Sequence, residues 1–448
     1  MQDISDTIDK IQGVSTYGTV SAVKGLLVES LGIDRFLTVG SRCVIYPNTG
    51  GRSVNGVNNQ GDGGIMAEVV GFREKTALLM PYSSLDGVGP GAKVEIQASQ
   101  LGVAPNHGWL GRVIDAFGRP IDGKGPIIEG DQEYPLKGSP INAHQRLRIG
   151  EKINIGIRSI NTFASCCKGQ RMGIFSGSGV GKSIVMSMLA RYSTADINVI
   201  GLVGERGREV QEFIQDDLGE EGLAKSVIVV ATSDEYALMR RQAAYMTMAI
   251  AEYFRDQGNH VLCLMDSITR FAMAQREIGL SAGEPPASKG YTPTVFSELP
   301  KLLERAGPGA QGSDGYITGI FTVLVEGDDT NEPISDAVRG ILDGHILLDR
   351  KIAERGRYPA VNVLKSVSRS MPDCNSDDEN EVIQEARDYM TAYEDMAEMI
   401  RLGAYRQGAD PVIDKAITFH PLVEAFLNQT KDEGTTLEEG YDKLAALL

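Results

Sequence analysis

The segment from Ser176 to Ser183 combines closely spaced glycines with a lysine and a hydroxyl side chain. Such a loop turns its backbone amides towards phosphate oxygens, and the helix that follows adds the positive end of its dipole. The lysine would reach the terminal phosphates, and the hydroxyl is a ligand for Mg²⁺, which prefers oxygen. Only Ser176 departs from the strict pattern, which has glycine there. We therefore expect ATP and Mg²⁺ to bind at Gly177, Ser178, Gly179, Val180, Gly181, Lys182 and Ser183.

The residues on either side of this loop fit a buried strand and a helix. The apolar run 172–175 precedes the loop, and apolar residues at helical spacing follow it at Ile184, Val185, Met188 and Leu189. An ordinary glycine-rich turn is the alternative, but it gives no reason for a Lys–Ser pair between a strand and a helix. The context therefore favours phosphate binding.

Carboxylates follow two further apolar runs. Asp266 ends the run 261–265, which is the Walker B arrangement, and we expect it to hold Mg²⁺ through water. Glu205 comes just after the run 197–203, at the carboxyl end of a strand, where ligands bind in open α/β sheets. We assign the polarisation of the attacking water to Glu205, the ordering of waters around Mg²⁺ to Glu209, and a catalytic role beside them to Arg206. A solvated charged turn is the alternative for 204–209.

Composition limits the classes of function. The chain has 448 residues and a net charge of −16, so we expect more than one domain and no nucleic-acid partner. No apolar run approaches the ~20 residues that span a bilayer, and the first residues do not resemble a signal peptide, so we expect a cytoplasmic protein. The five cysteines form no Cys-x-x-Cys pair, which argues against a disulfide framework or a structural metal site.

Patterning divides the chain into four parts. Residues 1–13 carry Ile4, Ile8 and Ile11 at helical spacing, which predicts a short amphipathic helix or, alternatively, a frayed terminus. Residues 14–96 alternate short β-rich runs with turn residues and predict a β-barrel with strands at 25–28, 42–46, 66–70 and 76–80, and a hairpin loop at 48–64. Residues 97–372 alternate strands and helices, which predicts a parallel sheet covered by helices, and 373–448 read as a helical domain.

Several of these strings together resemble a known superfamily. The glycine-rich loop, the segment 204–209, the strand ending at Asp266 and the string 359–369 are similar to the catalytic subunits of rotary ATPases. The strings 266–272 and 283–293 resemble the type III export ATPases, and 393–405 is similar to the flagellar members. This resemblance implies an α/β fold with a RecA-like P-loop NTPase core, an N-terminal β-barrel and a C-terminal helical domain. It also implies ATP hydrolysis by a homohexameric ring that energises flagellar type III protein export.

The resemblance also suggests roles for single residues. Arg369 matches the arginine finger that reaches a neighbour's γ-phosphate, although a surface salt bridge is the bland alternative. Tyr358 matches the aromatic residue that stacks on adenine, and otherwise it would be a packed core ring. The segment 283–293 corresponds to a loop near the central pore, whereas its residues alone predict only a loop.

The implied partners are those of an export apparatus. They are a central stalk protein in the pore, a stator-like regulator at 1–13, the export gate, and complexes of chaperones with their substrates. The chain would lie at the cytoplasmic face of that apparatus and associate with the membrane only through it.

Three other functions remain open. An injectisome export ATPase would share every catalytic residue. A non-catalytic ring subunit should lack the carboxylate that Glu205 supplies. A hexameric RNA helicase is opposed by the charge of −16 and by the lack of a basic, aromatic-rich N-terminal module.

Overall fold

The computed structural model describes residues 16–48, 63–97, 102–325, 327 and 332–448. The chain forms two compact units. One contains the described residues up to 97 together with 235–241 and 273–295, and the other contains the rest. The predicted N-terminal helix at 1–13 and nearly all of the predicted loop at 48–64 lie outside the described residues.

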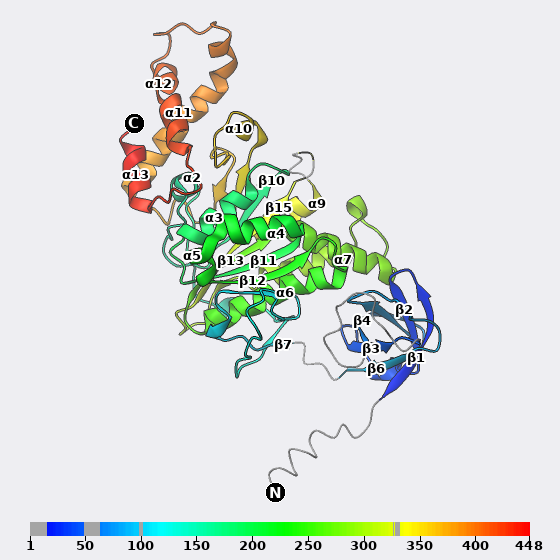
Figure 1. The fold of residues 1–448 in the computed structure, drawn as a ribbon. Coiled ribbons are helices and arrows are strands. Elements are labelled where there is room, and N and C mark those ends of the chain that lie inside the picture. The colour runs from blue at the N-terminus through cyan, green and yellow to red at the C-terminus, as the bar shows by residue number, and fades with distance from the viewer. Residues whose placement is uncertain (1–15, 49–62, 98–101, 326, 328–331) are drawn as a thin grey trace. The chain divides into compact units, whose positions relative to one another are not determined.

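The N-terminal unit is built on a closed antiparallel barrel with the strand order β1-β2-β5-β4-β3-β6, shown in blue in Figure 1. Side chains that alternate along the strands fill its core, among them Val28, Ile45, Leu79 and Val94. The predicted strand at 25–28 begins too early, because Gly25 has a φ of 60° and belongs to the turn between β1 and β2. The strands are β1 Tyr17–Lys24, β2 Leu27–Leu31, β3 Arg42–Tyr46, β4 Ile65–Arg73, β5 Thr76–Pro81 and β6 Lys93–Ile96.

The larger unit contains a sheet in the order β17-β16-β10-β15-β13-β11-β12-β8, with β14 paired to β15. All its pairs are parallel except β16–β17 and β14–β15. The strands of this unit are β7 Gly102–Val103, β8 Arg112–Asp115, β9 Tyr134–Pro135, β10 Arg171–Ser176, β11 Ile197–Glu205, β12 Ser226–Thr232, β13 His260–Asp266, β14 Gly307–Pro308, β15 Tyr316–Leu324, β16 Gly344–Leu348 and β17 Val367–Ser368.

Helices cover both faces of this sheet. On β11, the Asn198 side chain donates a hydrogen bond to the Ala190 carbonyl of α3 (Lys182–Tyr192), whereas Gly201 faces Thr247 of α6 (Ala237–Asp256). Residues three apart on a strand point to opposite faces, so α3 and α6 lie on opposite sides. The predicted α/β fold class is confirmed. The other helices that precede the C-terminal part are α2 Arg158–Phe163, α4 Gly207–Glu212, α5 Gly219–Ala224, α7 Ile268–Ala282, α8 Pro293–Leu303, α9 Pro333–Ile341 and α10 Arg350–Glu354.

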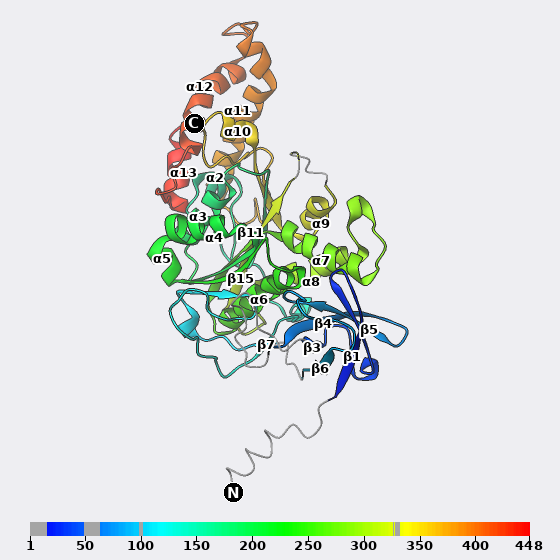
Figure 2. The ribbon, with the colours of Figure 1, turned by 45° about the vertical axis from the view of Figure 1, so that its right-hand side comes forward.

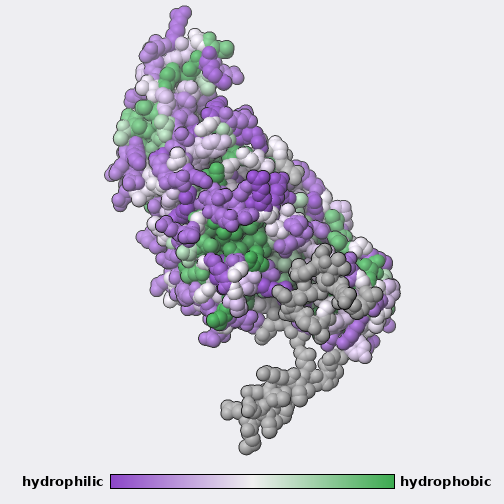
Figure 3. Space-filling model, in the orientation of Figure 1, coloured by the Kyte–Doolittle hydropathy of each residue, from purple (hydrophilic) through white to green (hydrophobic). Residues whose placement is uncertain are grey.

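Three helices close the chain, and Figure 2 shows α11 and α12 side by side and α13 next to α2. They are α11 Asp377–Arg401, α12 Pro411–Leu427 and α13 Leu437–Ala445. Capping boxes begin α11, at Ser376 and Glu379, and α13, at Thr436 and Glu439. No helix in the described part of the chain is long and apolar enough to cross a membrane. Polar residues cover most of the face drawn in Figure 3, in keeping with the charge of −16.

The end of β11 depends on one glycine. Gly204 has a φ of 72° and lies at an irregularity in the pairing of β11 with β12. A Cβ on Gly204 would lie 2.8 Å from Cβ of Arg270, which is closer than side-chain carbons pack. Both the left-handed backbone and the close approach therefore require glycine immediately before Glu205.

Replacing this glycine should destabilise the fold. We expect Gly204→Ala to lower the free energy of unfolding by about 1–3 kcal/mol, because it adds backbone strain and a clash with Arg270. Gly207→Ala is the matched control, since a Cβ there meets nothing within 4 Å. Urea denaturation of both variants measures the difference, and equal midpoints would contradict the steric argument.

Candidate nucleotide-binding site

The glycine-rich loop connects β10 to α3, as the flanking sequence predicts. Gly179 and Gly181 have φ values of 76° and 98°, which only glycine adopts without strain. Ser176 is the last residue of β10 and pairs with strands on both sides. Because Ser176 has ordinary strand geometry, the glycine of the strict pattern is not required there.

The sheet brings Lys182, Glu205 and Asp266 together. The Lys182 ammonium lies 2.5 Å from Asp266 Oδ1 and 3.3 Å from Glu205 Oε1, and all three side chains are largely buried. Asp266 ends β13 level with Leu202 of the neighbouring β11, and Glu205 ends β11 three residues later. Both carboxylates therefore lie at the carboxyl edge of the sheet, beside the first residue of α3.

A threonine that the sequence analysis missed holds Asp266 in place. Thr322 of β15 donates a hydrogen bond of 2.7 Å to Asp266 Oδ1, the same oxygen that faces Lys182. Strand β15 lies between β10 and β13 in the sheet, so this hydroxyl reaches Asp266 from the neighbouring strand. A buried polar residue in the apolar run 317–325 was the available signal, because such groups need a partner.

Asp266 and Glu205 share the one buried ammonium of Lys182, and this sharing and their burial determine the pKa shifts in the cluster. Burial, followed by the charge of Asp266, raises the pKa of Glu205 to about 7 against the opposing effect of Lys182. Burial alone would lower the pKa of Lys182, but the charges of Asp266 and Glu205 outweigh burial and raise it. Lys182 thus stays protonated, while Glu205 changes its charge near neutral pH.

The oxygen groups around the loop fit a magnesium ion that is held mainly by phosphates and water. Ser183 is exposed in the first turn of α3, and the Glu209 carboxyl hydrogen-bonds that of Glu205. Within the described residues no group of three or more His, Cys, Asp or Glu side chains could hold a metal alone. Mg²⁺ is usually held by one or two protein groups together with substrate phosphates, so a hydroxyl and Asp266 match its needs.

Of the other residues predicted for the site, Tyr358 and Arg206 lie next to the loop or the cluster. Tyr358 is 40% exposed, and a Cβ on Gly181 would lie 3.6 Å from its ring, so the ring lies against the loop. Arg206 is exposed and forms an ion pair of 3.1 Å with Glu209. Its guanidinium thus lies on the solvent side of the cluster. Arg350, which the sequence analysis did not single out, donates a hydrogen bond of 3.0 Å to the Ser178 carbonyl.

Arg369 lies at the amino edge of the sheet, opposite the carboxyl edge where Lys182, Glu205 and Asp266 meet. It follows β17, and its backbone N–H donates to the Asp343 carbonyl, just before β16 begins. The loop, by contrast, follows the point where Ser176 pairs with Leu348, the last residue of β16. Arg369 is exposed, and its guanidinium forms no hydrogen bond or ion pair with the described residues. The structure therefore does not bring Arg369 to the Lys182 cluster of its own chain.

Three family models match the chain. The nucleotide-binding domain of the ATP synthase alpha/beta family matches residues 156–368, and the β-barrel domain of that family matches residues 14–96. The T3SS EscN ATPase C-terminal domain matches residues 375–446.

Full-length relatives and solved structures agree with these matches. The flagellum-specific ATP synthase of Caulobacter vibrioides is 57% identical over 100% of this chain and 99% of its own length. That of Bacillus subtilis is 49% identical over 100% of this chain and 98% of its own length. The assembled ATPase EscN from the enteropathogenic E. coli type III secretion system superposes with a TM-score of 0.86 at 36% identity, covering 96% of this chain and 99% of EscN. EscN in complex with its central stalk EscO gives a TM-score of 0.84 at 36% identity, with the same coverage.

The comparisons confirm the resemblance inferred from the sequence strings. Identity at this level over the whole chain, together with the barrel, the P-loop core and the helical end, leaves the family in no doubt. The chain belongs to the flagellum-specific ATP synthases, a family of ATP-hydrolysing type III export enzymes.

Proposed function

We propose that this chain hydrolyses ATP at the Lys182 cluster and so energises flagellar type III protein export. The observation that carries this proposal is the buried Lys182–Asp266–Glu205 arrangement at the carboxyl edge of the sheet, directly behind a phosphate-binding loop. The flagellar system is favoured over the injectisome because the flagellar relatives reach 57% identity, whereas EscN reaches 36%. The presence of Glu205 favours a catalytic subunit over a non-catalytic one.

In the proposed mechanism the loop and Lys182 bind the phosphates of ATP. The amides of residues 177–183 and the N-terminus of α3 surround the phosphates, and the Lys182 ammonium exchanges carboxylate partners for phosphate oxygens. Mg²⁺, held beside Ser183 and Asp266 with Glu209 ordering nearby waters, would neutralise the charge that develops on the phosphates. Glu205, in its ionised form, orients and polarises the water that attacks the γ-phosphate. Its raised pKa makes it a stronger base than an ordinary carboxylate.

The adenine and the neighbouring subunit complete the proposed site. The exposed ring of Tyr358 beside Gly181 is available to stack on adenine. Arg369 cannot serve the loop of its own chain from the amino end of β16, so we assign it to the nucleotide of the next subunit. This assignment requires a closed ring, and we propose a homohexamer. Arg206, exposed and paired with Glu209, keeps its proposed catalytic role beside Glu205.

Further partners follow from the family. One solved relative is described as bound to a central stalk, and we propose that segment 283–293, which connects α7 and α8, faces such a stalk. We also propose a cytoplasmic location at the export apparatus, contacts with the export gate and with chaperone–substrate complexes, and a stator-like regulator that binds residues 1–13.

Removing Lys182 and neutralising Glu205 should have different effects. We expect Lys182→Ala to abolish turnover and weaken nucleotide binding, because it removes charge that the bound ground state needs. Glu205→Gln should keep binding but lower kcat by about 10²–10⁴-fold, because it removes only the polarising base. Fluorescent-nucleotide titration and phosphate release measure the two effects, with the exposed Glu212→Gln as a control. Near-normal turnover in Glu205→Gln would remove Glu205 from the mechanism.

The buried, ionised form of Glu205 should lower the free energy of unfolding, so the stability of the fold should depend on pH. Its pKa is about 7 in the folded chain and near 4.5 when unfolded, so the folded state binds more protons between these values. Stability therefore falls as the pH rises from 5 to 8. A glutamine does not titrate, so the gain in stability of Glu205→Gln over the wild type should grow by about 1–3 kcal/mol across this range. Urea denaturation without nucleotide measures this gain, with Glu212→Gln as the control, and a gain independent of pH would contradict the buried-carboxylate account.

Mixing two inactive variants tests the shared site. Lys182→Ala subunits keep Arg369, and Arg369→Ala subunits keep the loop, so some interfaces of a mixed ring combine an intact loop with an intact arginine. We expect each variant alone to lose about 10³-fold or more in turnover, and mixtures to recover part of it. Phosphate release is measured after mixed rings have been verified by native mass spectrometry. No recovery in verified mixed rings would mean that Arg369 does not act between subunits.

A further inference from the structure

Thr322 lies level with Asp266 on the neighbouring strand of the sheet. The pairing of β13 with β15 places Met265 opposite Phe321, so the next residues along, Asp266 and Thr322, point to the same face. Thr322 is 0% exposed and Asp266 is 4% exposed. A hydroxyl buried in this way needs a hydrogen-bond partner inside the protein.

The hydroxyl of Thr322 has one proton, and the distances show which acceptor receives it. Oδ1 of Asp266 lies 2.7 Å from Thr322 Oγ1, whereas the carbonyl oxygen of Met265 lies 3.4 Å away. A charged acceptor makes the shorter and stronger hydrogen bond, so the proton is donated to Oδ1. The Lys182 ammonium contacts the same oxygen at 2.5 Å. Oδ2 of Asp266 accepts no hydrogen bond from any residue that the structure describes.

The two partners of Oδ1 differ in how far they can move. The Lys182 ammonium sits on a long, flexible side chain, so it can exchange the carboxylate for phosphate oxygens. Thr322 lies on a strand inside the sheet, and its β-branched side chain has few rotamers. The end of this strand is fixed as well, because the Leu324 backbone N–H donates a hydrogen bond of 2.9 Å to Thr269 Oγ1 of α7. Thr322 is therefore the partner that stays on Oδ1 when Lys182 turns to a nucleotide.

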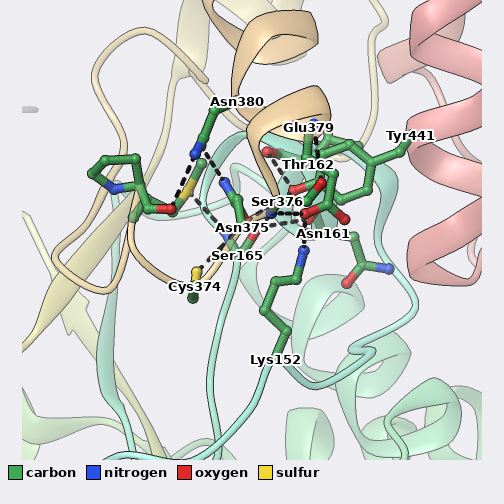
Figure 4. A network of polar contacts seen from close by, with 12 residues as sticks. Lys152, Asn161, Thr162, Ser165, Cys374, Asn375, Ser376, Glu379, Asn380 and Tyr441 are labelled. Atoms are coloured by element: carbon green, nitrogen blue, oxygen red, sulfur yellow. Dashed lines mark hydrogen bonds and ion pairs between the residues drawn. The ribbon is translucent and has the colours of Figure 1, made fainter.

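Buried hydroxyl groups elsewhere in this unit serve the fold. Figure 4 shows such a set, in which the Tyr441 hydroxyl of α13 lies 3.1 Å from Ser165 Oγ and 3.3 Å from Asn375 Oδ1. These three groups are neutral, and they join segments that are distant in the sequence. Thr322 differs from them because its acceptor is a carboxylate of the proposed site.

We propose that Thr322 is a positioning residue for magnesium binding. Its hydroxyl holds Oδ1 of Asp266, which leaves Oδ2 as the oxygen available to a water of the ion. Thr322 acts only through this carboxylate and does not itself contact the ion or the nucleotide. Partners that orient a metal-binding side chain matter in this way, since their loss costs about 10- to 100-fold in metal affinity or activity. The inference rests on the proposed function, in which Asp266 serves Mg²⁺.

Metal binding without turnover tests the proposal. The assembled full-length protein is saturated with ADP and titrated with Mn²⁺, and the free metal is measured by electron paramagnetic resonance. We expect Thr322→Val, which keeps the shape of the side chain and loses the hydroxyl, to weaken Mn²⁺ binding about tenfold. Thr322→Ser keeps the hydroxyl and should bind Mn²⁺ nearly as the wild type does.

Thr318 offers a matched control on the same strand. It is also 0% exposed, but its hydroxyl lies 2.8 Å from His260 Nε2 and accepts a hydrogen bond of 3.0 Å from the Gly169 N–H. Thr318→Val therefore removes a buried hydroxyl from β15 without touching Asp266, and it should leave Mn²⁺ binding unchanged. An equal loss in both valine variants would mean that Thr322 has only a structural role, and it would overturn the proposal.

Two further measurements separate positioning from a general loss of the site. The affinity for a fluorescent ADP in the presence of EDTA should be the same in Thr322→Val and the wild type, because the phosphate loop is untouched. In turnover, Thr322→Val should need about tenfold more Mg²⁺ for half-saturation and should approach the wild-type kcat when Mg²⁺ saturates. A lower kcat at an unchanged Mg²⁺ requirement would contradict a role in metal binding.

Asp266→Asn distinguishes failure of this inference from failure of the proposed site. Weak Mn²⁺ binding in Asp266→Asn together with normal binding in Thr322→Val would overturn the role of Thr322 and leave Asp266 in the site. Normal binding in both variants would remove Asp266 from the metal site, and the proposal with it. If Thr322→Val does not fold, Thr322→Cys takes its place, because a thiol is only a weak donor and the same loss of Mn²⁺ affinity is expected.

Discussion

The site depends on a buried ammonium group that is shared by two carboxylates. Lys182 contacts both Asp266 and Glu205, and this arrangement exists only because β10, β13 and β11 end at the same edge of one parallel sheet. A buried charge without a partner would cost several kcal/mol, so the three groups stabilise one another until phosphates replace the carboxylates. Thr322 adds a hydrogen bond to Asp266 from the intervening strand.

The same arrangement lowers the stability of the folded chain. Burial and the nearby charge of Asp266 raise the pKa of Glu205 to about 7, and the one lysine that the two carboxylates share offsets this only in part. Gly204 adopts a left-handed backbone immediately before this carboxylate, at the end of β11. Strain and unfavourable electrostatics are thus concentrated where a base of near-neutral pKa is needed for water activation.

The helical end is coupled to the loop by direct contacts. Tyr358, whose ring lies against Gly181, accepts a backbone hydrogen bond from Gln429 and donates one to Asn428 just after α12. On the other side of the core, the segment after β17 carries both Arg369 and Cys374 towards α11. The junction between the sheet and the last three helices therefore contacts the loop on one side and leads into α11 on the other.

The sequence by itself determined the phosphate loop, the two carboxylates after apolar runs, the α/β class and the family, because each depends on local spacing or on short strings. The order of the strands in the sheet decided which distant side chains meet. It placed Thr322 and Lys182 on one oxygen of Asp266, and Arg369 at the opposite edge from its own loop. Contacts between distant segments, such as Tyr358 with Asn428, leave no periodic signal in the chain, since tertiary packing alone brings them together.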